Sequence, residues 1–280
     1  MNHVPLAFIQ DLIRLTTPHH SKISDFQQLS GQYGSLARQF AENKHHVLFN
    51  IQDGSPDKLY VRGYRGPEER RATLSARFRV FKCVNFRVSN HSTPKLDSKL
   101  SSQLGKFVNE PGLLCLRLSS SSLDDKWIQL FSSWESLNSV RIKDDLTELV
   151  VQFLETLLNR EQLVGLMVHT GDYGQREADL FVNFLRQKQF LCLELNAYNE
   201  HFKTRVLAED DFKQFKGSVV HWRHNEKMHD DSFQLESRTR CSRTFKKGTL
   251  CVGYHNENGT EAMSDEEFIG GTRKGLLHWL

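Results

Sequence analysis

The sequence feature that most constrains the fold is a repeated pattern of apolar residues in the second half of the chain. The pattern apolar-x-x-apolar-x-apolar begins at Leu113, Leu137, Leu163 and Phe190, and a degraded fifth copy begins at Val219. Successive copies start 24, 26, 27 and 29 residues apart. Each copy has the length and apolar content of a short buried strand. A strand that recurs at this interval predicts one repeated supersecondary unit.

Amphipathic segments lie between these strands. The clearest runs from Asp145 to Arg160, where apolar residues follow helical spacing without a break, and shorter ones surround Trp127, Phe181 and Phe202. One strand and one helix cannot bury their apolar faces until neighbouring units stack on them. The pattern therefore predicts an α/β fold in the form of a degenerate leucine-rich-repeat-like solenoid. An ordinary α/β sheet built from βα units gives the same alternation and remains the alternative.

The rest of the chain differs from the repeats in its residue spacing and composition. The first residues have helical spacing, and the following residues alternate as strands do and are basic. A polar, Ser-rich stretch then precedes the repeats, and short strand patterns with turns end the chain. We therefore expect five parts: a three-helix head (1–43), a β-rich basic segment (44–90), a Ser-rich linker (91–111), the α/β repeats (112–228) and a C-terminal β cap (229–280).

Length, hydropathy and cysteine usage exclude several classes of protein. The chain has 280 residues, 38% of them hydrophobic, and its longest apolar runs are interrupted well before the roughly 18 residues of a membrane span. The N-terminus lacks a basic region and a cleavage site, and the five cysteines are scattered without a CxxC pair. We therefore expect an intracellular protein of the cytoplasm or nucleus, with reduced thiols and no membrane partner.

The net charge of +3 is unevenly distributed. The segment from Lys58 to Arg87 holds nine Lys or Arg residues against two Glu, and phenylalanines alternate with these cations. A second basic stretch runs from Arg238 to Lys247. Such stretches suit a phosphate backbone, with the aromatic rings as stacking surfaces. The same alternation arises in any half-buried strand with a solvated face, so nucleic-acid binding is kept only as an alternative.

No catalytic motif stands out. The chain lacks a nucleophile elbow, a zinc-protease helix and a dinucleotide-binding glycine fingerprint. His221 and His224 lie three positions apart on an expected strand, so they point to opposite faces and do not suit a zinc site. Acidic pairs such as Asp144 and Asp145 fall where helices begin, which the helix dipole favours without catalysis. We therefore expect no enzymatic activity, no cofactor and no metal.

The N-terminal segments resemble an F-box. Three apolar helical patterns follow one another there: Val4-Pro5-x-x-Phe8-Ile9-x-x-Leu12-Ile13, Ile23-x-x-Phe26-x-x-Leu29-Ser30 and Gly31-x-Tyr33-x-x-Leu36-Ala37. Val4 stands where the F-box has Leu, and Tyr33 where it has Trp. With the repeats behind them, these segments make the chain similar to nematode proteins that join an F-box-like N-terminus to a divergent leucine-rich or FTH-type repeat region.

The resemblance implies a substrate-recruiting subunit of a cullin-type ubiquitin ligase. Its head would present apolar side chains to a Skp-type linker protein. The residues expected in that contact are Val4, Pro5, Phe8, Leu12, Leu29, Tyr33 and Leu36. The alternative is a repeat scaffold without a ligase link, in which the same helices only cap the solenoid.

The strands of the repeats also predict where a target protein would bind. Side chains alternate between the two faces of a strand, so the residues between the apolar positions face away from the helices. The residues expected on this target-binding face are Arg117, Arg141, Met167, Glu194, His221 and Arg223. The face mixes both charges, which favours a protein or peptide ligand over a small molecule.

Overall fold

A computed structural model gives the fold of most of the chain. It describes residues 26–62, 74–89, 95–170, 172–196, 200–208, 215, 219–223, 227–229, 231–247, 249–272 and 274–279. The chain divides into two units, residues 1–116 and 117–280. Strands and helices alternate along both, so the expected α/β class is confirmed. The helices predicted before residue 26 lie outside the described residues.

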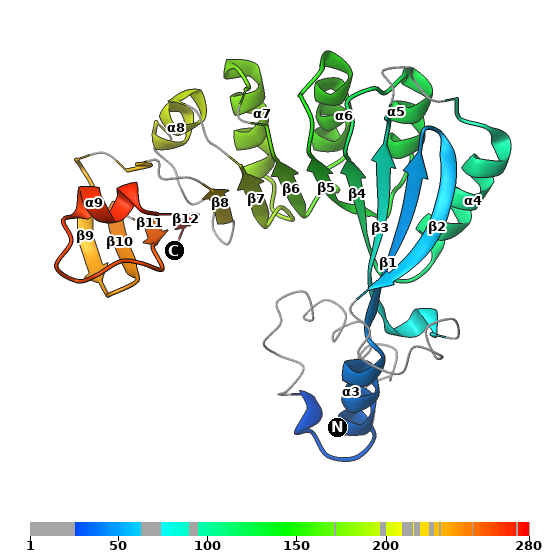
Figure 1. Ribbon diagram of the computed structural model, residues 1–280, viewed down its shortest axis with the longest axis horizontal. Helices are drawn as coiled ribbons and strands as arrows, with labels where there is room; N and C mark the ends of the chain where they lie inside the picture. The colour runs from blue at the N-terminus through cyan, green and yellow to red at the C-terminus, as the bar shows by residue number, and fades with distance from the viewer. Residues whose placement is uncertain are drawn as a thin grey trace. The chain divides into compact units, whose positions relative to one another are not determined.

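The first unit contains a sheet whose strand order is β2-β1-β3-β4 (Figure 1). Its elements are α3 (Gly31–Asn43), β1 (His45–Gln52), β2 (Ser55–Arg62), the short 3₁₀ helix η3 (Ala76–Phe78), β3 (Arg79–Arg87), α4 (Ser98–Asn109) and β4 (Leu113–Leu118). Strands β1 and β2 form an antiparallel hairpin, and β3 runs parallel to β1. Asp53 and Gly54 turn the hairpin with φ of 51° and 78°, as a two-residue type I′ turn requires.

Two small groups of aromatic residues hold the first unit together. Phe40 of α3 packs edge-on against Phe78, with ring centroids 5.9 Å apart, so the helix is fixed to the start of β3. Phe49 of β1 contacts Phe107 of α4, with centroids 5.3 Å apart. These contacts place α3 at one end of the sheet and α4 against the face that Phe49 presents.

Helix α4 corrects the expectation of a linker at residues 91–111. Ser98–Asn109 is helical, although its composition is polar. Its buried residues follow helical spacing, namely Leu100, Leu104, Phe107 and Val108. The Asp97 side chain accepts a hydrogen bond of 2.6 Å from the Leu100 N–H and caps the helix. Four apolar side chains on one face outweigh the serines on the other.

The second unit contains consecutive strand and helix pairs followed by an antiparallel region. Its elements are α5 (Asp125–Ser132), β5 (Leu137–Ile142), α6 (Glu148–Asn159), β6 (Gly165–Val168), α7 (Gln175–Leu185), β7 (Cys192–Leu195), α8 (Glu200–Leu207), β8 (Val219–Arg223), β9 (Gln234–Arg238), β10 (Ser242–Lys247), β11 (Leu250–His255), α9 (Asp265–Gly270) and β12 (Lys274–Trp279). The strand order is β5-β6-β7-β8-β12-β11-β10-β9. Strands β5 to β8 are parallel neighbours in sequence order.

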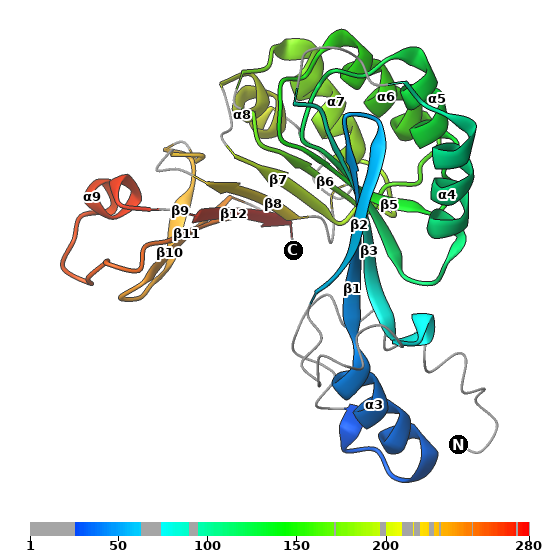
Figure 2. The same ribbon diagram turned by 45° about the vertical axis from the view of Figure 1, so that its right-hand side comes forward.

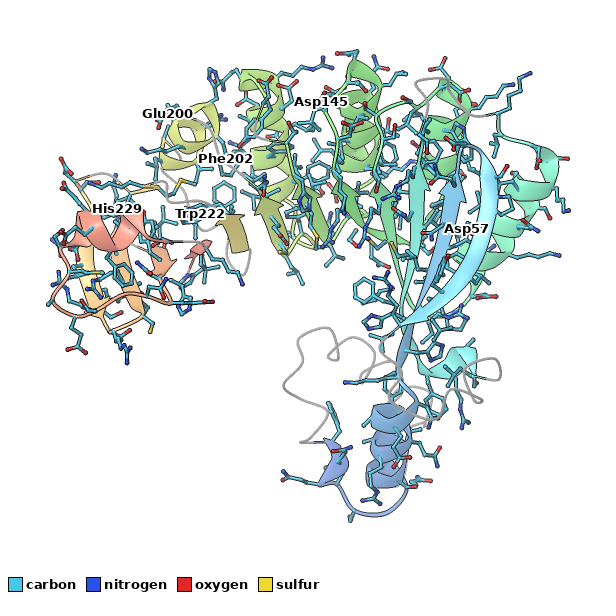
Figure 3. The ribbon with its side chains drawn as sticks, in the orientation of Figure 1. Asp57, Asp145, Glu200, Phe202, Trp222 and His229 are labelled. Carbon is cyan, nitrogen blue, oxygen red and sulfur yellow. The ribbon has the colours of Figure 1, made fainter. Side chains whose placement is uncertain are left out.

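Helices α5 to α8 lie on one side of these parallel strands (Figure 2). The apolar positions in the three copies of the repeated pattern that begin at Leu137, Leu163 and Phe190 are buried and at most 1% exposed. Successive strand and helix repeats also contact each other through aromatic side chains. Phe131 of α5, for example, packs edge-on against Phe153 of α6. Phe202 of α8 and Trp222 of β8 are buried in the same way (Figure 3). The other face of the strands carries half-buried side chains.

The antiparallel region continues the sheet from β8, because β12 pairs with β8 and β11 pairs with β12. Tyr254 of β11 organises its core. The Tyr254 hydroxyl accepts hydrogen bonds from the Met228 and His229 N–H groups, at 2.8 and 3.3 Å, and lies 2.7 Å from His229 Nδ1. The His229 ring stacks on Phe245 with centroids 3.9 Å apart. The region also contains α9, which the sequence pattern did not predict and which Ser264 and Glu267 cap reciprocally.

None of the helices in the described part of the chain is long and apolar enough to cross a lipid bilayer.

Candidate functional site

The predicted target-binding face contains a row of side chains at one register level. Arg141 of β5 pairs with Met167 of β6, Met167 with Glu194 of β7, and Glu194 with His221 of β8. Arg141, Met167 and Glu194 are all half-buried on the face that the helices leave uncovered. Four residues predicted from separate repeats therefore occupy equivalent positions on adjacent strands.

Arg141 and Met167 contact each other directly. The Nε and Nη2 atoms of Arg141 lie 3.0 and 2.7 Å from the Met167 sulfur. The Arg141 side chain thus reaches from β5 to β6. Glu194 carries the opposite charge one strand beyond Met167. A partner that bears both charges and an apolar group would match this row.

Arg117 and Arg223 were also predicted on this face. Arg117 follows Leu116 on β4 and is half-buried, and its Nε is buried without a hydrogen-bond partner in the described part of the chain. Arg223 is the last residue of β8. It lies two positions beyond His221, the register partner of Glu194.

A second row of register neighbours lies two residues earlier on each of these strands. Ser139, Gly165 and Cys192 are register neighbours on β5, β6 and β7. Burial, together with the negative charge of Glu194, raises the pKa of the Cys192 thiol to about 11. A thiol with this pKa is protonated and unreactive at neutral pH, so the row has no nucleophile.

The residues predicted to bind the Skp-type protein are only partly described. Val4, Pro5, Phe8 and Leu12 lie outside the described residues. Of the other three, Leu29 is 41% exposed just before α3, Tyr33 is half-buried, and Leu36 is buried. Leu36 lies beside Ala37 and Phe40, which form the cluster that joins α3 to β3. Leu36 therefore supports the head from inside and does not present its side chain to a partner.

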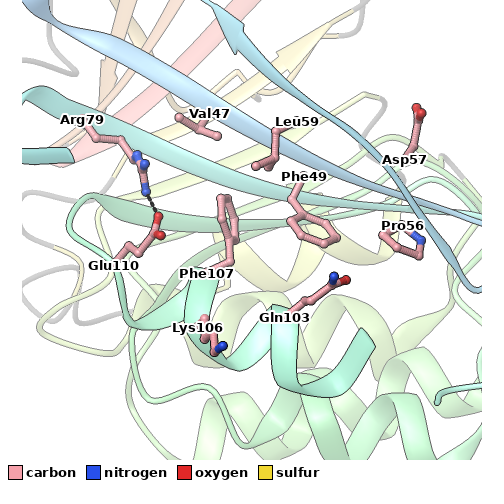
Figure 4. A pocket seen from close by; sticks show the side chains of 10 residues that line it. All are labelled: Val47, Phe49, Pro56, Asp57, Leu59, Arg79, Gln103, Lys106, Phe107 and Glu110. Carbon is pink, nitrogen blue, oxygen red and sulfur yellow. Dashed lines mark hydrogen bonds and ion pairs between the residues drawn. The ribbon is translucent and has the colours of Figure 1, made fainter. Parts of the chain in front are cut away.

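The structure contains a pocket that the sequence pattern did not predict. A cavity of about 540 Å³ lies between β1, β2 and α4 in the first unit (Figure 4). Its apolar lining comes from Val47, Phe49, Pro56, Leu59 and Phe107. Its polar lining comes from Asp57, Arg79, Gln103, Lys106 and Glu110.

Arg79 is the most deeply placed polar group of this pocket. The residue is only 9% exposed, and its Nη1 forms an ion pair with the Glu110 carboxylate. Its Nε is buried and has no hydrogen-bond partner among the described residues. The guanidinium carbon lies 6.0 Å from the centre of the Phe107 ring. A buried donor without an acceptor lowers the stability of the folded chain.

Lys82 lies behind the pocket and is almost completely buried. Its ammonium group donates hydrogen bonds to the carbonyls of Val108 and Glu110 at the end of α4. Burial, together with the positive charge of Arg79, lowers the pKa of Lys82 to about 8, and Glu110 opposes this shift. Lys82 thus satisfies carbonyls at the C-terminal end of α4 and stabilises the helix there.

The burial of Arg79 and Lys82 bears on the alternative of nucleic-acid binding. Both residues belong to the basic segment, and both are engaged inside the first unit. In the second basic stretch, Arg243 is fully buried, contacts Asp265 and stacks on Phe268, while Arg238 contacts the same Asp265. These cations are neutralised internally and are not arranged to follow a phosphate backbone.

A signal for the buried lysine exists in the sequence. Lys82 has the same parity along its strand as Val80, Val84 and Phe86, all of which are buried. Alternation therefore places it on the apolar face, where a charged residue needs partners. The pocket itself has no such signal, because its lining comes from four segments that only the folded chain brings together.

Comparison of the chain with protein-family models, with curated proteins and with solved structures found no match.

Proposed function

We propose that this chain is a non-enzymatic protein-interaction adaptor that binds a protein target on the helix-free face of its parallel strands. The observation that carries the proposal is the row formed by Arg141, Met167 and Glu194. These residues lie side by side on three strands, are partly accessible, and combine a cation, an apolar thioether and an anion. A flat surface of mixed character suits a protein segment better than a small molecule, which needs a concave site.

The contacts between successive units support a solenoid of leucine-rich-repeat type for residues 112–228. Arg176 of α7 forms ion pairs with Glu148 and Glu155 of α6, and Arg205 of α8 forms one with Asp179 of α7. Helices α7 and α8 are thus each joined to the preceding helix by charged side chains. In such an array each unit contacts only its neighbours, and the strand face is left free for a partner.

Backbone carbonyls at the helix ends give a second set of contacts between units. The Gln162 side chain donates to the carbonyl of Trp134, at 3.1 Å, and the Gln187 side chain donates to that of Leu158, at 2.5 Å. In both pairs, a glutamine that follows one helix satisfies a carbonyl at the end of the preceding helix. A contact of this kind between two successive pairs of repeats is expected of a repeated fold.

Charge reversal at Arg141 tests the target-binding face. Proteins that co-purify with the wild-type chain should be retained by Lys126→Glu, which makes the same charge change on the exposed side of α5. They should be lost from Arg141→Glu, since the variant removes the cation of the row and places a negative charge beside Met167. If both variants co-purified with the same proteins in equal amounts, this face would not be the target-binding site.

We further infer that the N-terminal head docks on a Skp-type linker protein of a cullin ubiquitin ligase. The inference rests on the F-box resemblance, and Leu29, which is 41% exposed, supports it as an apolar side chain open to a partner. Tyr33 lies on the first turn of α3, where it is half-buried. The other expected contacts are Val4, Pro5, Phe8 and Leu12.

Co-purification with the Skp-type protein tests this second part. The wild-type chain should bind it, and the double variant Pro5→Ala, Leu12→Ala should not, because two apolar anchors are removed. Leu235→Ala is the control, because it truncates an exposed leucine in the second unit, and it should bind normally. Failure of the wild type under conditions where a known F-box protein binds would leave a repeat scaffold without a ligase link.

A further inference from the structure

The row on the helix-free face continues onto β4 at Arg117. The Lys143 N–H, just after β5, donates to the Leu118 carbonyl at the end of β4, at 2.9 Å. The corresponding bond between the ends of β6 and β5 is also 2.9 Å long and accompanies the parallel register of those two strands. Because parallel ladders repeat this pattern, the same offset makes Arg117 the register neighbour of Arg141. Both arginines belong to the second unit.

The two arginines are half-buried and keep donors that a partner can reach. Arg141 donates only to the Met167 sulfur, which is a weak acceptor. Neither arginine forms an ion pair with a residue in the described part of the chain. Within that part, Nε of Arg117 is a buried atom without a hydrogen bond, whereas the Nη atoms of Arg117 and Nη1 of Arg141 are not. The donors open to a partner are therefore these Nη atoms.

The charges around the two arginines favour an anion at this end of the row. Lys143 lies two positions beyond Arg141, is exposed, and adds a third cation. The Asp144 carboxylate already accepts from the N–H and hydroxyl of Ser121, at 2.8 and 3.0 Å. Glu194 lies two strands from Arg141, which is about 10 Å at the usual strand spacing. The end of the row on β4 and β5 therefore has an excess of positive charge.

The other end of the row specifies an apolar and a basic group. Neighbouring strands are about 4.8 Å apart, so Met167 and Glu194 lie about 7 and 12 Å from the midpoint between Arg117 and Arg141. An extended chain advances about 3.3 Å per residue, so two and four residues span about 7 and 13 Å. Side chains at every second position of an extended chain also point to one face. The row therefore matches an extended segment that crosses the strands.

We propose that the target is bound through an extended segment that carries an acidic, an apolar and a basic residue at every second position. The acidic side chain accepts from Arg117 and Arg141, with the charge and planar geometry that a guanidinium matches best. The apolar side chain lies on Met167, and the basic side chain pairs with Glu194. This inference rests on the proposed binding of a protein target to the same face, and it adds the chemistry of the target segment.

Selection from a random library of ten-residue peptides displayed on phage tests the proposal, with the full chain immobilised. Isolated peptides of this length are not stable helices in water, so the library samples extended segments. Enriched peptides should contain Asp or Glu, an aliphatic residue or Met two positions away, and Lys or Arg four positions away, in either chain direction. Enriched peptides without an acidic residue would overturn the proposal, and so would the absence of enrichment.

Charge exchange localises the acidic contact. In fluorescence anisotropy, replacing the acidic residue of an enriched peptide by Lys should weaken binding to the wild type about tenfold to a hundredfold, the effect of one charge-assisted hydrogen bond. The double variant Arg117→Glu, Arg141→Glu should reverse this preference and bind the Lys peptide more tightly, which a merely misfolded chain would not do. Lys126→Glu, on the exposed side of α5, is the control and should keep the preference of the wild type.

The basic contact is tested in the same way at the other end of the row. Glu194→Lys should weaken binding of the enriched peptide about tenfold, and a peptide with Glu in place of its basic residue should restore it. No restoration in either charge exchange would contradict the proposed order of charges.

The results also separate this proposal from the proposed function. Peptides that lose binding to the double arginine variant but have no acidic requirement would leave the face as the target-binding site and overturn only the proposed target segment. Peptides that bind the wild type and the double variant equally would lie on another surface and would count against both.

Discussion

At the residue scale, the most informative side chains are charged groups inside the first unit. Arg79 and Lys82 would be assigned to a solvated basic surface by their place in a run of cations, yet both are buried. Each has a defined contact: Arg79 with the Glu110 carboxylate, and Lys82 with two carbonyls at the end of α4. A buried charge that keeps its hydrogen bonds is tolerated, whereas removal of its partners is strongly destabilising.

The lowered pKa of Lys82 predicts how stability depends on pH. The folded chain has a Lys82 pKa of about 8, against an ordinary value of 10.5, so the unfolded chain binds more protons between these values. The contribution of Lys82 to the free energy of unfolding should therefore rise from pH 8 to pH 10.5, by on the order of 1–3 kcal/mol.

Denaturant unfolding of the wild type and of Lys82→Met over this pH range measures the effect. The difference between the two chains isolates Lys82 from the other groups that titrate. The wild type should gain stability relative to the variant as the pH rises. A difference that is constant between pH 8 and pH 10.5 would show that Lys82 keeps an ordinary pKa in the folded chain.

At the scale of single elements, local side chains decide where helices and strands begin and how closely they approach. Asp97 caps α4, Asp124 caps α5 through a 3.0 Å hydrogen bond to the Trp127 N–H, and Ser264 caps α9. These caps satisfy N–H groups that have no partner within the helix. For α4 the cap matters most, because it sets the start of a helix in a Ser-rich stretch.

Replacement of the α4 cap should destabilise the first unit. Asp97→Ala removes the acceptor for the Leu100 N–H and is expected to lower the free energy of unfolding by about 1 kcal/mol. Lys99→Ala, an exposed position on the same helix, is the control and should change stability by less than about 0.5 kcal/mol. Urea unfolding of the three chains provides the comparison, and equal stability of Asp97→Ala and wild type would contradict the role of the cap.

Two strand glycines provide a second test at this scale. A Cβ at Gly275 of β12 would overlap the indole ring of Trp222 on β8, whereas a Cβ at Gly165 of β6 would meet its nearest neighbour, the Cys192 carbonyl oxygen, at an ordinary 3.5 Å. Gly275→Ala should therefore cost about 1–3 kcal/mol, because it overpacks the contact between the parallel and antiparallel regions. Gly165→Ala is the matched control and should be tolerated. Thermal unfolding that ranks the two variants in the opposite order would refute this interpretation.

At the scale of the whole molecule, the near-neutral charge conceals a basic segment whose cations are partly used for internal contacts. The total of +3 comes with nine Lys or Arg residues between Lys58 and Arg87. Of these, Arg79 and Lys82 are buried, and Arg77 lies over the Phe78 ring at 4.4 Å. Cations that are buried, such as Arg79 and Lys82, cannot contact a phosphate backbone or release counterions from it.

We therefore expect only weak binding to single-stranded oligonucleotides. Fluorescence anisotropy at physiological salt should give a dissociation constant no tighter than about 10⁻⁴ M, the weak end of non-specific binding. A micromolar dissociation constant that weakens steeply with added salt would restore nucleic-acid binding as a function. A matched titration with an acidic peptide would show whether such binding were a property of charge alone.

The sequence by itself determined the repeated strand and helix units, because their apolar positions recur with the periods of regular secondary structure and each pattern is local. It also placed Arg141, Met167 and Glu194 at equivalent positions, since alternation along a strand is a property of the backbone. It did not locate α4 within the Ser-rich stretch. Only the tertiary structure decided that helix, the burial of Arg79 and Lys82, and the pocket between β1, β2 and α4. The pocket depends on residues from Val47 to Glu110 that meet only when the hairpin and the helix pack together.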